Sequence, residues 1–133
     1  MPETLSADEA RRMRIVSIGM LIGVVMFLSV ASLTHFTLKP HPLPIVSWFA
    51  VGFALLSPVI AGFVDRARPD RTARPGAPSP AFSRHLVAYA TLEAAGILCA
   101  AALMMAGSLL PFVAAAVPIG AMLLRFPRAS AAS

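Results

Sequence analysis

The sequence feature that most constrains the fold is an apolar run from residue 85 to 107, which holds one acidic residue, Glu93. The hydrocarbon core of a bilayer is about 30 Å thick, and a helix needs about 20 residues to cross it. Residues 86–106 meet that length, and a run this long satisfies its backbone hydrogen bonds in lipid as a helix. We therefore expect a transmembrane helix with Glu93 near mid-membrane.

Small and polar side chains recur along this run at helical spacing. Steps of three, four or seven residues place them on one face of the expected helix. We expect this face to point into protein, and it consists of His85, Tyr89, Glu93, Gly96, Ala100 and Gly107.

The composition indicates the same class of protein for the whole chain. Hydrophobic residues make up 58% of it and charged residues only 13%, and the mean hydropathy is +0.79. Soluble proteins have about 25% charged residues. The 133 residues have room for four spans and short links, but for no separate soluble domain. We predict an all-α polytopic membrane protein of one domain, with four transmembrane helices as two hairpins, at residues 15–34, 45–64, 86–106 and 109–126.

The amino-terminal helix is expected to begin near Ser6, because Ser6 and Glu9 have the spacing of a capping box. The arginines and the apolar run that follow also resemble a secretory signal peptide. Acidic residues among the first ten, and an apolar run longer than the roughly 7 to 15 residues usual in signal peptides, favour an uncleaved anchor.

Prolines mark one link and two bends. Pro40, Pro42 and Pro44 hold the link after the first span extended. Within the second span, Pro58 frees a backbone carbonyl one turn earlier, and the hydroxyl of Ser57 is a candidate to satisfy it. Pro118 predicts a bend in the fourth span.

Metal ligands are scarce in this sequence. His35 and His41 lie on either side of Pro40, but no cysteine or acidic residue stands beside them to complete a metal site. Cys99, the single cysteine, lies inside the third span and is expected to be a small buried hydrophobe. The sequence predicts no metal and no other cofactor.

Residues 65–84 break the apolar pattern with prolines, a glycine and charged residues, which predicts a disordered basic loop. The net charge of +5 does not indicate nucleic acid as a partner, because the basic residues all lie outside the apolar runs. The expected partner is a bilayer with anionic headgroups, at about 1 kcal/mol for each arginine close to it. The candidate headgroup contacts are Arg66, Arg68, Arg71, Arg74 and Arg84.

The distribution of basic residues predicts an orientation. With four spans, ten of the 11 Lys and Arg residues fall on one side of the membrane and Lys39 alone on the other. By the positive-inside rule, both termini and the basic loop lie in the cytoplasm. The expected location is a cell inner membrane, crossed several times.

Glycines predict where helices approach one another. Gly19 and Gly23 form a GxxxG pair in the first span, which lets another helix backbone come close. Gly96, one turn after Glu93, leaves room for a facing helix. The partner is another span of the same chain or a second copy, so a homo-oligomer or a complex with other membrane proteins is expected.

The stretch from Tyr89 to Leu98, with Glu93 among alanines and leucines, resembles the carboxylate helix of rotor-ring proteolipids, the c subunits of rotary ATP synthases. The sequence Arg68-Pro69-Asp70 resembles their polar cytoplasmic loop. This resemblance implies that Glu93 binds an ion and that the second span is its companion helix. The whole chain is similar to small uncharacterised four-span bacterial membrane proteins, a likeness that implies no activity.

Two functions follow from Glu93. A neutral Glu93 is a hydrogen-bonding residue that holds helices together, at about 0.6 to 2 kcal/mol. Alternatively it carries a proton or cation, with Tyr89 and His85 as its neighbours. We expect a packing or assembly component without enzymatic activity, and the alternative is a proton-linked transporter or ion-translocating component. A lipid-modifying enzyme with Glu93 as its base ranks third.

Overall fold

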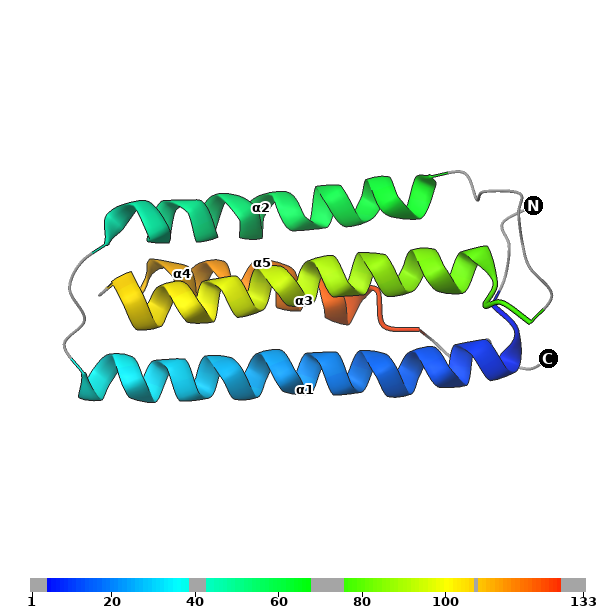
Figure 1. Cartoon of the computed structure of the whole chain (residues 1–133), viewed down its shortest axis with the longest axis horizontal. Coiled ribbons are helices and arrows are strands. Elements are labelled where there is room, and N and C mark those ends of the chain that lie inside the picture. Colours follow the sequence, from blue (N-terminus) through cyan, green and yellow to red (C-terminus); the bar gives the residue numbers. More distant parts are fainter. Residues whose placement is uncertain (1–4, 39–42, 68–75, 107, 128–133) are drawn as a thin grey trace.

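A computed structural model describes residues 5–38, 43–67, 76–106 and 108–127. The regular structure within these ranges is helical, as expected for an all-α protein. The helices are α1 (Ala7–Thr37), α2 (Pro44–Arg66), α3 (Pro80–Ala106), α4 (Leu110–Ala114) and α5 (Ala116–Leu124), and Figure 1 shows them lying nearly parallel along one long axis. Of these, α1, α2 and α3 are long and apolar enough to cross a membrane.

The predicted capping box is confirmed at the start of α1. The Glu9 amide donates to the Ser6 hydroxyl at 3.2 Å, and the Ser6 amide donates to Glu9 Oε2 at 3.2 Å. The second oxygen of Glu9 accepts from the Ser79 amide at 2.9 Å, just before α3. This backbone hydrogen bond from Ser79, followed by one with the Ser79 side chain and then by those from Ser6, holds the pKa of Glu9 below its usual value. The cap of α1 thus also ties α1 to the start of α3.

The predicted hydrogen bond of the Ser57 hydroxyl beside Pro58 is confirmed as well. Pro58 has no N–H with which to bond the carbonyl of Ala54, and the Ser57 hydroxyl donates to that carbonyl at 2.8 Å. The replacement hydrogen bond leaves α2 continuous through the proline.

The predicted disordered loop is wrong at both of its ends. α2 continues to Arg66, and α3 already begins at Pro80. The early start of α3 has a local cause, because Pro80 suits a first helical position and the Ser79 hydroxyl accepts from the Phe82 amide at 3.1 Å. Residues 68–75 of the loop, and Gly107 after α3, lie outside the described residues.

The fourth predicted span, residues 109–126, is two short helices. The apolar segment Leu110–Leu124 is shorter than the roughly 20 residues that a helix needs to cross a bilayer. It is interrupted at Ala115, where a turn joins α4 to α5. Pro118 explains the interruption, because it cannot donate to the carbonyl of Ala114 four residues earlier.

The core of the bundle lies around α3. In the most apolar stretch of each helix, half of α3 is buried, compared with 22% of α1 and 28% of α2. Figure 1 shows α1 and α2 on opposite sides of α3, with α4 and α5 behind it. Most buried residues of α3 are small, which brings its neighbours close, and they include Ala88, Ala95, Cys99, Ala100 and Ala102. The expectation that Cys99 is a buried hydrophobe is confirmed.

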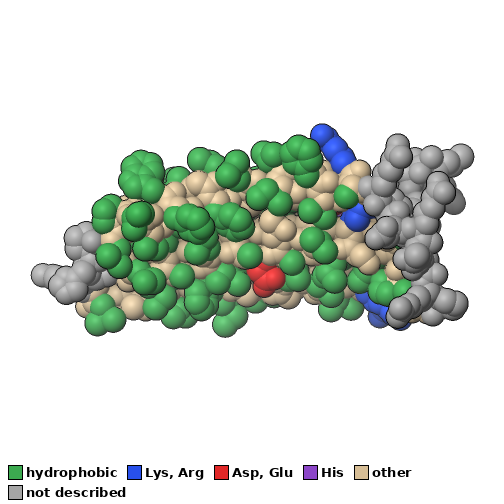
Figure 2. All heavy atoms as spheres, turned by 45° about the horizontal axis from the view of Figure 1, so that its top comes forward, with side chains coloured by type: hydrophobic (Ala, Val, Ile, Leu, Met, Phe, Trp, Pro, Cys, Tyr) green, Lys and Arg blue, Asp and Glu red, His purple; other side chains and the backbone are tan. Residues whose placement is uncertain are grey.

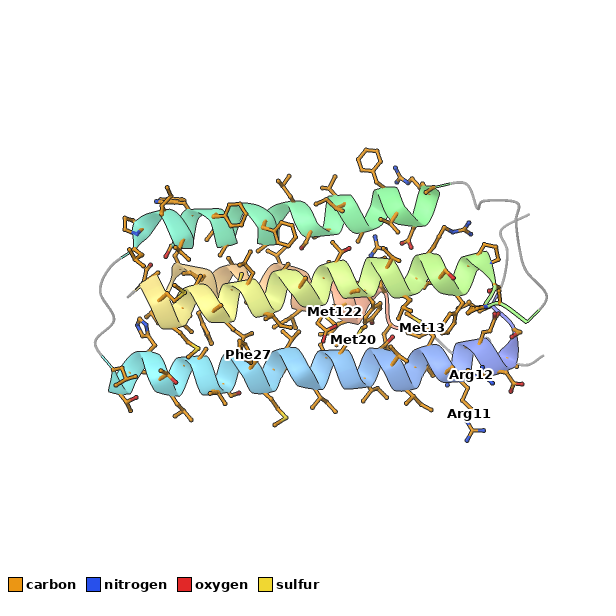
Figure 3. The ribbon with its side chains drawn as sticks, viewed as in Figure 1. Arg11, Arg12, Met13, Met20, Phe27 and Met122 are labelled. Carbon is orange, nitrogen blue, oxygen red and sulfur yellow. The ribbon has the colours of Figure 1, made fainter. Side chains whose placement is uncertain are left out.

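Methionines fill the space between α1 and α5. Met13 of α1 and Met122 of α5 are almost fully buried, and Met20 of α1 is partly buried against the same cluster. Figure 3 shows these three side chains directed toward the space between the helices, whereas Arg11 points away from the bundle. Flexible thioether side chains suit this irregular gap.

The arginines of the described chain gather at one end of the bundle. Arg11, Arg12 and Arg14 lie near the start of α1, Arg66 ends α2, Arg84 lies in the first turns of α3 and Arg125 follows α5. Figure 2 shows the Lys and Arg side chains of the visible face near this end and hydrophobic side chains over most of the remainder. We call it the basic end.

Polar contacts between elements also concentrate at the basic end. Besides the bond between Glu9 and Ser79, Arg14 Nε donates to the carbonyl of Pro127 at 3.1 Å. At the far end, within the described residues, His35 Nδ1 lies 3.0 Å from the carbonyl of Leu103 and links α1 to α3.

Candidate functional site

Glu93 lies near the middle of α3 with its carboxyl group directed at α1. The side chain is neither fully buried nor fully exposed. Glu93 Oε1 lies 3.8 Å from the position that a Cβ atom on Gly23 would occupy. The missing side chain of Gly23 therefore leaves room for the carboxyl group beside α1.

The carboxyl group of Glu93 makes no hydrogen bond and no ion pair with the residues that the structure describes. Figure 2 shows hydrophobic side chains over most of the visible face away from the basic end, and the exposed residues of α3 on the side of Glu93, Ala90 and Ile97, are apolar. A carboxyl group in such surroundings keeps its full hydrogen-bonding capacity for a partner outside the bundle or for a bound proton.

The three predicted packing glycines have different surroundings. A Cβ atom on Gly96 would lie only 2.6 Å from Val24 Cγ1, so α1 and α3 are in close contact there. Gly23 borders the Glu93 carboxyl group, and a Cβ on Gly19 would meet nothing within 4 Å. One end of the GxxxG pair therefore faces open space.

Within the described residues, neither Tyr89 nor His85 is hydrogen-bonded to Glu93. The Tyr89 side chain is buried, and its hydroxyl donates a hydrogen bond to the Met122 carbonyl, which joins α3 to α5. His85 lies at the basic end, with Nδ1 4.0 Å from Asp65 Oδ1. The three candidate proton-handling residues thus face three different neighbours, and the expected inward face of α3 is buried at Tyr89, Gly96 and Ala100 but only partly at Glu93 and His85.

A polar cluster at the basic end was not predicted from the sequence. Arg125, which caps α5, forms an ion pair and a hydrogen bond with Asp65 in the last turn of α2. Gly62 leaves space for the guanidinium group, because its Cβ would lie 3.7 Å from Arg125 Nη2. The available signal was one acidic residue at the end of the second span and one basic residue at the end of the fourth, on the same predicted side.

The candidate headgroup contacts are described only in part. Arg66 is exposed at the end of α2. Arg84 donates to the carbonyl of Ala67 at 3.4 Å, across the gap between α2 and α3. Arg68, Arg71 and Arg74 lie outside the described residues.

At Glu93 the described residues offer hydrogen bonding and proton binding. No group of three His, Cys, Asp or Glu side chains in the described ranges is placed to hold a metal ion. Comparison with protein-family models, with curated proteins and with solved structures gave no match for this chain.

Proposed function

We propose that the protein is a small integral inner-membrane protein with a packing or assembly role and no enzymatic activity. The observation that supports this role is the Glu93 carboxyl group, which lies in an apolar surface at mid-helix without a hydrogen-bond partner in the described chain. Lipid tails offer such a group no hydrogen bond, whereas another membrane helix does, at about 0.6 to 2 kcal/mol. Association with a protein surface is therefore favourable at this site.

The proposed topology has four crossings, with α4 and α5 together as the fourth. At 1.5 Å per residue, Leu110–Leu124 extends about 22 Å, so this crossing needs a locally thinned bilayer or flanking residues that reach the interface. The gathering of arginines at the basic end supports cytoplasmic termini and contact with anionic headgroups on that side.

Cysteine labelling tests the topology. We expect Ala77→Cys, near the start of α3, to react with a membrane-impermeant maleimide only when the cytoplasmic face is accessible. Leu38→Cys, just after α1, should react from the outside. Native Cys99 is fully buried and serves as the unreactive background. Labelling of Ala77→Cys in intact cells would show that the orientation is reversed.

A proton-linked transporter is the second candidate. It is favoured by the partial exposure of Glu93, since a carrier group must exchange protons with its surroundings. The directions of Tyr89 and His85 give it less support, because neither residue extends a hydrogen-bonded path to the carboxyl group.

Flux measurements in proteoliposomes separate the two functions. For a packing role, we expect neither the wild-type protein nor Glu93→Gln to move protons in response to an imposed pH gradient. Gln keeps the size of Glu and its ability to form hydrogen bonds, but its amide cannot take up or release a proton. Proton flux in the wild type that disappears in Glu93→Gln would establish the transporter and exclude the packing role.

A further inference from the structure

We infer that the surface formed by Gly19, Gly23 and Glu93 is the contact between two copies of this chain, with the two Glu93 carboxyl groups hydrogen-bonded to each other. This inference rests on the proposed packing role and names its partner.

The surface combines a polar group with room for close approach. Glu93 lies beside Gly23, and Gly19, one turn earlier on α1, meets nothing within 4 Å. On α3, the exposed residues Ala90 and Ile97 lie three positions before and four positions after Glu93, on the same side of the helix. Small residues on both helices let the backbone of a partner come within hydrogen-bonding distance of the carboxyl group.

Symmetry makes a second copy a suitable partner. Two copies inserted in the same direction are related by a two-fold axis along the membrane normal. This axis puts each residue at the same depth as its counterpart and brings residues close to the axis beside their own copies. The two Glu93 side chains then lie at the same depth without any adjustment. A copy that approached through this surface would thus place its Glu93 opposite the first.

The chemistry of the group also suits self-association. A neutral carboxyl group has one donor and one acceptor, so two of them satisfy each other through a pair of hydrogen bonds. No lysine or arginine lies within residues 15–34, 45–64 or 86–106 to pair with an ionised Glu93 instead. The contact therefore forms between neutral groups.

The opposite side of α1 offers a contrast. There a groove of about 330 Å³ lies between α1 and the α4–α5 segment, lined by Val25, Leu28, Ser29, Ser32, Phe112 and Ile119. Its two hydroxyls already donate to carbonyls of α1, Ser29 to Val25 and Ser32 to Leu28, each at 2.8 Å. Every side-chain donor of this groove is satisfied, so acyl chains can fill it without the loss of a hydrogen bond. At the Glu93 surface, by contrast, acyl chains would leave the carboxyl group without a hydrogen bond.

Disulfide cross-linking of the full chain in phospholipid vesicles tests the inference. We expect Ala90→Cys, close to the proposed axis, to form a cross-linked dimer on oxidation. Val59→Cys, which is exposed on α2, is the matched control and should remain monomeric. The wild-type chain should give no dimer either, because Cys99 is buried.

Second-site substitutions in the Ala90→Cys chain test the contact itself. Glu93→Leu should lower the dimerisation constant about 3- to 30-fold, as expected for the lost hydrogen bonds. Glu93→Gln, whose amide also pairs with itself, should retain dimerisation within about threefold. Gly19→Leu should reduce the dimer by blocking close approach, whereas Gly52→Leu on α2 should not, although both positions are equally open within one chain.

Glu93→Leu removes no hydrogen bond within the described chain, and Gly19→Leu adds a side chain where nothing lies within 4 Å. Helix content and thermal unfolding should therefore stay as in the wild type. A monomer at Ala90→Cys, or equal effects of Gly19→Leu and Gly52→Leu, would overturn the inference. A monomer without proton flux would leave the packing role standing with a different partner. Proton flux that depends on Glu93 would overturn the packing role whatever the oligomeric state.

Discussion

Valine in place of Gly96 is expected to push α1 away from α3 and to lower the free energy of unfolding by about 1–3 kcal/mol. Even the first carbon of the new side chain would lie 2.6 Å from Val24 Cγ1 and 3.3 Å from Cγ2. Val24 is completely buried and branched at Cβ, so it has little freedom to move aside. The strain must therefore separate the two helices.

Unfolding in mixed micelles, followed by circular dichroism, measures this effect. Gly52→Val is the matched control, because its Cβ meets nothing within 4 Å and the change in helix propensity is the same. Val24→Ala combined with Gly96→Val should recover part of the loss by vacating the space. If Gly96→Val were as stable as Gly52→Val, the close contact between α1 and α3 would be refuted.

Reversal of the charge at Arg125 is expected to detach α5 from α2. In Arg125→Glu the ion pair with Asp65 is replaced by two like charges, and the side chains are only 24% and 29% exposed. The loss of a hydrogen bond between charged groups at such a site lowers the free energy of unfolding by about 1.5–3 kcal/mol. Hydrogen exchange of the last amides of α5 should become faster, while exchange in α1 should change little.

The exchanged pair provides the control. Asp65→Arg combined with Arg125→Glu restores opposite charges at the same place and should recover most of the stability, so that the double-mutant cycle shows a large coupling energy. Independent, additive losses from the two single substitutions would mean that the pair contributes nothing to holding the helices together.

Features that depend on residues near one another in sequence were predictable. Of the four spans predicted from the apolar run lengths, three are long helices, and the spacing of Ser6 and Glu9 identified the cap of α1. The role of the Ser57 hydroxyl followed from the one carbonyl that Pro58 leaves free. Each of these depends on the geometry of a single helix, which the sequence specifies.

Features that depend on how helices face one another were not predictable. The pairing of Asp65 with Arg125 requires the relative rotation of α2 and α5. The direction of the Glu93 carboxyl group depends on which residue of α1 lies opposite, and Gly23 was indistinguishable from Gly19 in the sequence. The bond from the Ser79 amide to Glu9, 70 residues away, depends on how the starts of α1 and α3 lie beside each other.

Because the polar contacts between elements are unevenly distributed, the helices are held together more firmly at the basic end than at the far end. Glu9, Arg14, Asp65 and Tyr89 tie the elements together toward the basic end. In the far half of the described bundle, the links are the contact of His35 with the Leu103 carbonyl and the longer one from the Cys99 thiol to the Ala50 carbonyl, at 3.8 Å. Helices that are held together at one end separate most at the other. A tilt of about 5° moves the free end of a 31-residue helix by about 4 Å. Changes in bilayer thickness or lateral pressure should therefore be absorbed as splaying on the side of the membrane away from the arginines.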